Sequence, residues 1–138
     1  MTGGTGWLWA TTTDNRLWRR LGLQYEINWQ EIGHANNVVG MTFANGNLFP
    51  ASPPAPSGKL FAATSDNRLW ARDPVPSDVN WQDIGHANNV RAMAFGNGKL
   101  FAATSDNRLW ARDPVLSDVN WQDIGHANNV VGMTRFLA

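Results

Sequence analysis

The chain is built from a tandem repeat, and this repeat restricts the possible fold more than any other feature of its 138 residues. Residues 59–90 and 99–130 are identical except that Pro76 in one copy corresponds to Leu116 in the other, and the two copies lie 40 positions apart. A more diverged copy comes first, with Trp18 lying 52 positions before its counterpart Trp70. Units of this length in tandem are small modules that bury their apolar faces against one another.

The longer spacing between the first two copies locates an insertion between them. Four of the eight residues from 50 to 57 are proline, which cannot donate a hydrogen bond to a strand ladder. We expect these residues to form a surface loop. The resulting division is an N-terminal tail at 1–6 and a repeat region at 7–138, with repeat units 7–46, 59–98 and 99–138 and a Pro-rich insertion around 47–58.

Each repeat unit predicts four short strands. In the last copy they cover residues 90–95, 99–104, 108–112 and 119–124, with Gly125 closing the fourth. Turn residues such as Gly, Asn and Asp separate the strands, and the third strand alternates with period two. No stretch has apolar residues at helical spacing, so we expect an all-β chain.

Four strands in about 40 residues, repeated in tandem, are typical of the four-stranded antiparallel blades of a β-propeller. A β-sandwich can also be made from hairpins, but it does not require every unit to be alike. The sequence therefore favours a propeller with three blades per chain.

Three blades are too few to close a ring, since propellers have roughly 4 to 8. The predicted strands begin with the second strand of a blade, at 7–12, and finish with a first strand, at 130–136. We expect a homodimer in which two chains form one six-bladed ring and each last strand completes the other chain's first blade. A fragment that assembles in some other way is the main alternative.

Composition excludes several classes of partner. With 11 basic and 11 acidic residues and a net charge of +0, the chain lacks the positive charge that captures nucleic acid or an anionic membrane. It has no cysteine, so it forms no disulfide or thiolate metal site. No apolar run approaches the ~20 residues of a membrane span, and residues 1–6 lack the features of a signal peptide. We expect a soluble chain without membrane insertion, and its location is not specified by the sequence.

A candidate binding face is formed by the loops after the second and fourth strands, which emerge on the same side of a blade. These loops carry Ser65 to Asn67 and Gly85 to Asn89 in the middle copy. Amides, a carboxylate, a guanidinium and a flat indole suit a sugar, whose hydroxyls need donors and acceptors and whose C–H face stacks on aromatic rings. The candidate ligand-binding residues are His34, Asn36, Asn37, Asp66, Asn67, Arg68, Trp70, Trp81, His86, Asn88, Asn89, Asp106, Asn107, Arg108, Trp110, Trp121, His126, Asn128 and Asn129.

Structural roles are an alternative for several of these residues. Asp66 and Asn67 have the composition of an ordinary turn, in which Asn takes a left-handed conformation. Trp70 and Trp81 can fill the space between blades, and His86 can bond to a neighbouring backbone. We also expect packing or backbone roles for Leu69, Ile84, Gly85, Val90 and Met93.

Catalysis is not indicated. The chain has no nucleophile motif and no pair of acids at a catalytic spacing, and each candidate residue recurs in every copy. A metal site on the ring axis would need His34, His86 and His126 to converge, which their position in the loop after the fourth strand disfavours. We therefore predict no enzyme activity, no cofactor and no metal site.

The motifs also resemble those of a known family. Asn-Trp-Gln-Asp-Ile-Gly-His-Ala at 80–87, Leu-Phe-Ala-Ala-Thr at 100–104 and Asn-Arg-Leu-Trp at 107–110 resemble the repeats of tectonin and tachylectin-like propellers. The resemblance covers the chain outside the tail and the insertion. It implies a multivalent propeller lectin that binds glycans at several sites per ring and needs no cofactor. The alternative is a non-catalytic structural or protein-interaction propeller, designed or fragmentary and without a ligand, which the near-identity of the last two copies favours.

Overall fold

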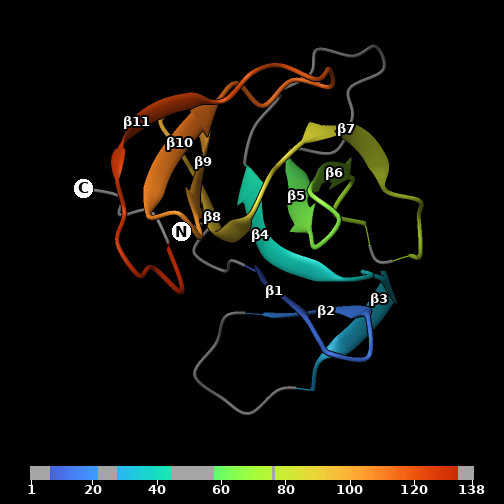
Figure 1. Cartoon of the computed structure of the whole chain (residues 1–138). Coiled ribbons are helices and arrows are strands. Elements are labelled where there is room, and N and C mark those ends of the chain that lie inside the picture. The colour runs from blue at the N-terminus through green and yellow to red at the C-terminus, as the bar shows by residue number, and fades with distance from the viewer. Residues whose placement is uncertain (1–6, 22–27, 45–57, 76, 134–138) are drawn as a thin grey trace, which may run out of the picture.

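The computed structural model describes residues 7–21, 28–44, 58–75 and 77–133, which form eleven strands and no helix. The strands make three separate antiparallel sheets that follow one another along the chain and lie in an arc (Figure 1). The prediction of an all-β chain is confirmed. Repeated antiparallel sheets of this kind are consistent with a propeller-like architecture.

The three sheets, which we name A, B and C, are offset from the repeat units, because B and C each begin with the last strand of the preceding unit. Sheet A contains β1 (Trp7–Thr11), β2 (Arg16–Leu21) and β3 (Gln30–His34). Sheet B contains β4 (Val38–Ala44), β5 (Lys59–Thr64), β6 (Arg68–Arg72) and β7 (Gln82–His86). Sheet C contains β8 (Val90–Gly96), β9 (Lys99–Thr104), β10 (Arg108–Arg112) and β11 (Gln122–His126). Sheets B and C have four strands each and sheet A has three.

The Pro-rich insertion connects two strands that are direct neighbours. β4 and β5 pair antiparallel, with Met41 opposite Ala62 and Phe43 opposite Leu60. The predicted insertion around 47–58 therefore joins the two strands of one hairpin, although only Gly58 of it belongs to the described residues. The tail at 1–6 lies outside the described residues as well.

The turns after the second strands have the predicted chemistry. Asn67 has a φ of 68°, in the left-handed region that Asn tolerates better than most residues. Its N–H donates to the Thr64 carbonyl at 2.9 Å, and the Thr64 hydroxyl donates to Asp66. The same turn occurs around Asn15 and Asn107, both with a φ of 66°.

Two strand predictions need correction. The fourth strand of the last copy covers Gln122–His126 rather than 119–124, because Trp121 turns toward sheet B and donates to the His86 carbonyl at 2.8 Å. Gly125, predicted to close the strand, lies within it. The described part of the predicted 130–136 strand, residues 130–133, belongs to no ladder, since no strand is paired with it.

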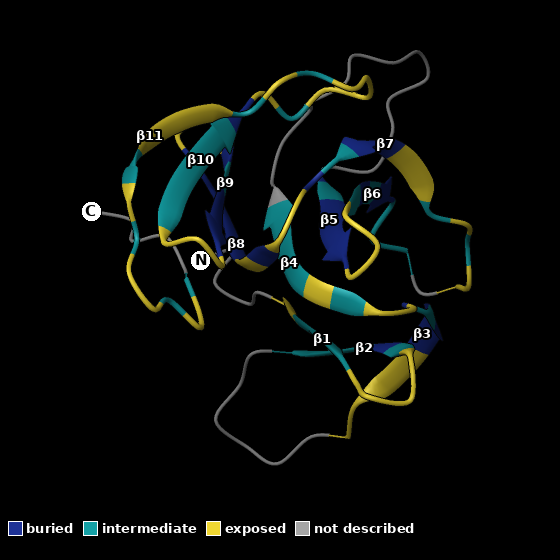
Figure 2. Cartoon of the chain, viewed as in Figure 1, coloured by how far each residue is buried: buried dark blue, intermediate teal, exposed yellow. Residues whose placement is uncertain are grey.

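The core lies between sheets, where β4 of sheet B contacts β8 of sheet C. The predicted packing residues Leu69, Ile84, Val90 and Met93 are all buried there. Figure 2 shows β5 and β9 largely buried and β11 largely exposed. Burial therefore falls toward the outer strand of the last sheet.

The described part of the chain contains no helix of the length and apolarity needed to cross a membrane.

Leu69 and Leu116 offer a matched test of this core. Leu69 is fully buried, whereas Leu116 is 38% exposed. We expect Leu69→Ala to lower the free energy of unfolding by about 2–5 kcal/mol, because it removes buried apolar surface and leaves a cavity. Leu116→Ala should change it by no more than about 0.5 kcal/mol. Urea unfolding at one protein concentration measures both, and equal losses would contradict the assignment of the core.

Candidate functional site

Among the described residues, two pockets of matching composition lie between neighbouring sheets. The larger, between sheets B and C, has a volume of about 480 Å³, and the smaller, between sheets A and B, about 210 Å³. The B–C pocket is lined by His86, Ala87, Asn88, Asn89, Val90, Ala102, Thr104, Asp106, Trp110, Asn120 and Trp121. The A–B pocket is lined by Asn36, Asn37, Val38, Ala62, Thr64, Asp66, Trp70 and Trp81. The lining residues of the smaller pocket are the repeat equivalents of eight of those in the larger one.

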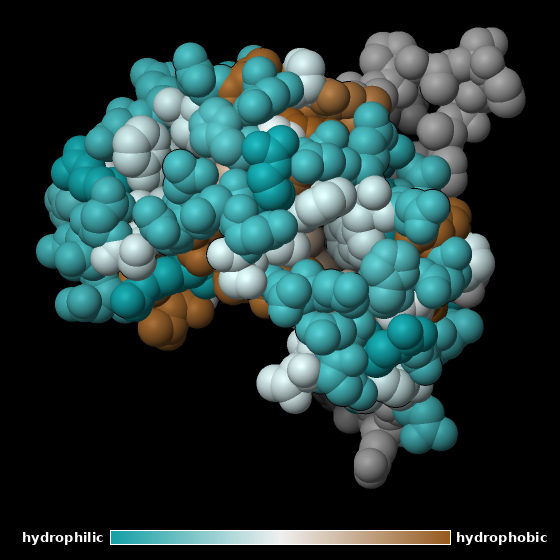
Figure 3. Space-filling model, turned by 45° about the vertical axis from the view of Figure 1, so that its right-hand side comes forward, coloured by the Kyte–Doolittle hydropathy of each residue, from teal (hydrophilic) through white to brown (hydrophobic). Residues whose placement is uncertain are grey.

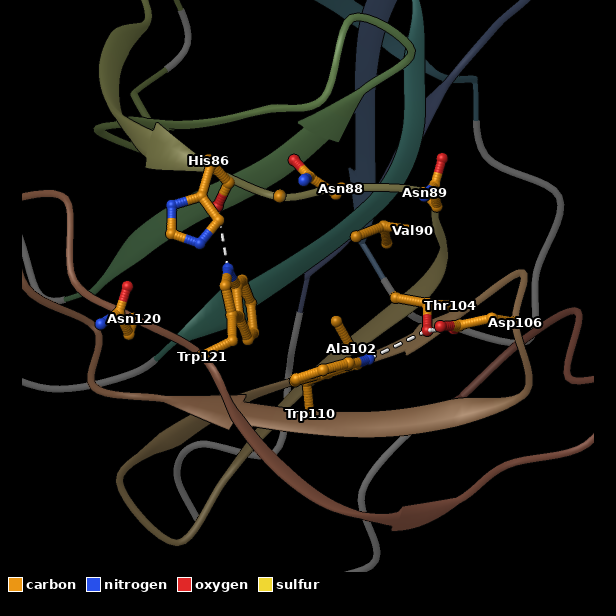
Figure 4. Close-up of a pocket in the computed structure, with 11 residues that line it drawn as sticks. His86, Asn88, Asn89, Val90, Ala102, Thr104, Asp106, Trp110, Asn120 and Trp121 are labelled. Atoms are coloured by element: carbon orange, nitrogen blue, oxygen red, sulfur yellow. Dashed lines mark hydrogen bonds between the residues drawn. The ribbon is translucent and has the colours of Figure 1, made fainter.

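Each pocket is built from two sheets. In the B–C pocket, the end of β7 supplies His86 and the loop after it supplies Asn88 and Asn89. Trp110 of β10 and Trp121, just before β11, supply the indoles. Figure 4 shows these two indoles facing the same space beside the loop. The site therefore depends on how two neighbouring sheets are held together.

The indole N–H groups are already used inside the protein. Trp110 Nε1 donates to Thr104 Oγ1 at 3.0 Å, and Trp121 Nε1 donates to the His86 carbonyl at 2.8 Å (Figure 4). Trp70 makes the corresponding bond to Thr64 at 2.9 Å. Since these donors are occupied, what the rings offer a ligand is apolar surface.

Polar groups stand at the open side of the B–C pocket. Asn88 and Asn120 are exposed, so their amides can exchange water for a ligand. Asp106 accepts a hydrogen bond from Thr104, and a carboxylate has acceptor sites for further donors. The site thus combines apolar ring surface with neutral amides and one carboxylate.

A histidine–aspartate pair joins the two sheets beside the B–C pocket. His86 Nδ1 lies 2.7 Å from Asp118 Oδ1, and the His86 N–H donates to the same oxygen at 3.3 Å. His34 and Asp78 make the same two contacts between sheets A and B, also at 2.7 and 3.3 Å. The hydrogen bond from the histidine side chain, helped by its backbone N–H, lowers the pKa of Asp118 and of Asp78. The ring of each histidine is therefore bound by a carboxylate of the next sheet. A bond from the His86 side chain to a neighbouring backbone, one alternative given by the sequence, is not the contact that forms.

Glycine makes this approach possible. Gly85 has a φ of 133°, and a Cβ there would lie 2.5 Å from Asp118 Oδ1 and 2.9 Å from its Cα. Gly33 stands in the same relation to Asp78, with a φ of 138°. The special backbone role predicted for Gly85 is confirmed, and it lets the aspartate loop of the next sheet sit against the strand.

A buried arginine fixes the loop that carries the aspartate. Arg112 donates to the carbonyls of Val115 at 2.8 Å and Ser117 at 2.9 Å, and it reaches the Ile84 carbonyl of sheet B at 3.4 Å. Burial lowers the pKa of Arg112, as it does that of Arg72 in sheet B. The loop is therefore held by its own sheet and by the preceding one.

The pockets bring together part of the predicted set. His86, Asn88, Asn89, Asp106, Trp110 and Trp121 line the B–C pocket, and Asn36, Asn37, Asp66, Trp70 and Trp81 line the A–B pocket. The remaining candidates are not among the lining residues of either pocket: His34, Asn67, Arg68, Asn107, Arg108, His126, Asn128 and Asn129.

Several of those remaining candidates have structural partners. Arg68 donates to both oxygens of Asp83, at 3.0 and 2.8 Å, and this bond raises the pKa of Arg68. Arg108 binds Asp123 in the same way. Asn67 accepts from the Asn89 N–H at 2.9 Å, which ties the two loops of one sheet together.

Sequence reasoning missed Thr104, Ala102, Asn120 and Asp118. A signal was present for the threonine, which lies two residues before the aspartate in every copy, at 12, 64 and 104. The role of Asp118 had no such signal, because its partner His86 belongs to another repeat unit.

Within the described ranges, no group of three or more His, Cys, Asp and Glu side chains is placed to hold a metal ion. Neither protein-family models nor curated proteins gave a match when compared with this chain.

The histidine–aspartate pairs predict an acid-dependent stability. Because folding lowers the pKa of Asp118 and Asp78, their contribution is present above the unfolded pKa of about 3.9 and is lost as pH falls through the folded pKa. We expect the thermal unfolding midpoint to fall as pH is lowered below about 4. D78N/D118N should lose part of this dependence.

A matched control removes the same type of charge from the same loop. Asp113 is an exposed partner of Lys99, and such surface pairs contribute little. D113N should therefore keep the acid dependence of the unsubstituted chain. If D78N/D118N has the same acid profile as D113N, the assignment of the two pairs is wrong.

Proposed function

We propose that this protein is a non-catalytic, multivalent carbohydrate-binding lectin with its sites between neighbouring sheets. The observation that carries the proposal is the recurrence of one pocket composition at two sheet boundaries. Each pocket has two indoles, an aspartate and consecutive asparagines, with Trp110 and Asp106 in the larger one and Trp70 and Asp66 in the smaller.

The chemistry of the pockets suits a neutral sugar. Ring faces can pack on the C–H face of a pyranose, while Asn88, Asn120 and Asp106 supply donors and acceptors for its hydroxyls. The volume of about 480 Å³ falls within the range of small-molecule sites. A net charge of +0 gives no general attraction for anions, so the proposed ligand is a neutral glycan.

Repetition supports multivalency. An open polar site of this kind binds a single sugar weakly, and several equal sites on one body raise the overall affinity for a surface that displays many sugars. The face seen in Figure 3 is mainly hydrophilic, with separate hydrophobic patches.

We further propose that two copies form one six-bladed ring, so that the number of sites doubles in one assembly.

A structural or protein-interaction propeller is the second candidate. It is favoured by the identity of residues 59–90 and 99–130 at all but one position, which does not require a ligand. The two candidates differ in what the exposed pocket amides do. In the lectin they contact sugar, and in the structural propeller they contact only water.

A glycan array separates the two candidates. We expect binding to neutral glycans by the unsubstituted chain and at least a roughly tenfold loss in N36A/N88A, because each substitution removes an amide that lines one of the two pockets. Q82A/Q122A is the control, since Gln82 and Gln122 are exposed strand amides that line neither pocket. Absence of any glycan binding by the folded, unsubstituted chain would overturn the lectin proposal.

A further inference from the structure

The two outer flanks of the chain present matching halves of the contact that joins its sheets. Five of the eight exposed large apolar side chains among the described residues lie in or beside sheet A or on β11 and the residues after it: Trp7, Leu8, Trp29, Ile124 and Val131. We propose that sheet C of one copy and sheet A of a second copy enclose a third pocket, which neither copy contains alone. That this pocket binds a sugar rests on the proposed function, whereas the formation of the pocket does not.

The contact that joins sheets occurs twice in the same form. At the B–C boundary, Trp121 and Asp118 of sheet C hold His86 of sheet B, and Arg112 reaches the carbonyl of Ile84. At the A–B boundary, Trp81, Asp78 and Arg72 of sheet B make the same contacts with sheet A. We call the last strand of a sheet, which carries the histidine, its receiving flank. We call the side with the tryptophan, acidic residue and arginine that contact the preceding sheet its gripping flank.

The receiving flank of sheet C is uncovered. Ile124 is 43% exposed, whereas its equivalents Ile32 and Ile84 are each 2% exposed. Gly125 has the same φ of 138° as Gly33, yet among the described residues no atom beyond its own chain neighbours lies within 4 Å of the position its Cβ would take. The strand around Gly125 therefore has the backbone conformation that accommodates an acidic loop in sheets A and B. Sheet A of the same chain does not cover this strand.

The gripping flank of sheet A is already arranged. The Arg20 guanidinium lies 5.8 Å from the ring centre of Trp29, compared with 5.7 Å between Arg72 and Trp81. Trp29 is 42% exposed, and Trp18 Nε1 donates to Thr12 Oγ1 at 2.9 Å as in the other two sheets. Sheet A therefore repeats the arginine–tryptophan pair of a following sheet, and the counterpart of Asp78 in its sequence is Glu26, which lies outside the described residues.

The residues that would line the third pocket are all present. The first repeat differs from the second at many positions, with Trp9 for Phe61 and Arg19 for Ala71 among them. None of these differences falls on a position that lines the B–C pocket. The lining of the third pocket would be His126, Ala127, Asn128, Asn129 and Val130 from one copy with Ala10, Thr12, Asp14, Trp18, Asn28 and Trp29 from the other.

A strand position beside β1 supports the same junction. β4 pairs with β5 in sheet B, but among the described residues β1 pairs only with β2. Leu8 of β1 is accordingly 51% exposed, whereas its equivalent Leu60 in β5 is fully buried. A cavity of about 340 Å³ adjoins β1 and is lined in part by Trp7, Leu8 and Trp9.

The segment that fits this position begins with the same sequence as β4. Residues 130–133 read Val-Val-Gly-Met, as residues 38–41 do. In sheet B, Met41 of β4 lies opposite Ala62 of β5. The same register places Met133 of one copy opposite Ala10 of the other, where paired strands bring Cβ atoms to about 4.5–5.5 Å. Met133 of the same chain also lines the cavity beside β1, so a closure within one chain is the competing arrangement.

Disulfide cross-linking tests the junction without a ligand. The chain has no cysteine, so Ala10→Cys in one preparation and Met133→Cys in another can link only between chains. We expect a covalent dimer when the two are mixed and oxidised, because the paired register brings the two sulfurs within bonding range. A mixture of Ser117→Cys with Met133→Cys is the control and should give little product. The proposal is overturned if the first mixture gives no more dimer than the control, or if A10C/M133C links only within one chain.

Subunit complementation then tests the pocket itself. N36A/N88A removes the amide from both pockets within a chain and should leave the junction pocket active, measured with the array glycan that the unsubstituted chain binds most strongly. Adding Asn128→Ala or Asp14→Asn to this background should abolish the remaining binding, because each disables one half of the junction.

Mixing the two inactive proteins gives the decisive result. A mixed dimer combines an intact Asn128 from one chain with an intact Asp14 from the other, so random pairing should restore about a quarter of the binding sites of N36A/N88A. No recovery after mixing overturns the shared pocket, even where the cross-link forms. If the unsubstituted chain binds no glycan while the cross-link forms, the lectin proposal fails and the junction stands.

Discussion

The contact between neighbouring sheets is the interaction on which the rest of this structure depends. A small antiparallel sheet cannot bury enough apolar surface alone, so each must be covered by the next. Gly85 allows the Asp118 loop to approach, the carboxylate binds His86 through its side chain and its backbone, and Trp121 binds the same histidine's carbonyl. One residue of one sheet is thus held at three points by the next sheet.

The pockets are a consequence of this contact. Trp121 reaches His86 across the boundary between the two sheets. The space beside this tryptophan, between the loop after β7 and the sheet C residues Ala102 and Trp110, is the B–C pocket. Residues such as Trp121 therefore serve both packing and any binding, and their substitution disturbs both. Asn88 and Asp106 stand at the open side, so they are the positions where binding can be changed with least effect on assembly.

The repeat and its turn chemistry were sufficient to predict the all-β fold, the first three strands of the last copy and the left-handed turn at Asn67. Local patterns could not place the start of β11, because the direction of Trp121 is decided by sheet B. They also could not reveal Asp118, since its partner lies 32 positions earlier in another unit. Contacts between repeats depend on how the sheets are stacked, which the pattern within one repeat does not contain.

The central claim is that the contact found twice within the chain also joins one copy to another, through the uncovered strand around Ile124 and the prearranged flank around Trp29. The molar mass in solution, measured by light scattering over a range of concentrations, tests this claim most directly. We expect twice the chain mass of 15.3 kDa as the main species. A single species of 15.3 kDa that persists at every concentration would contradict it.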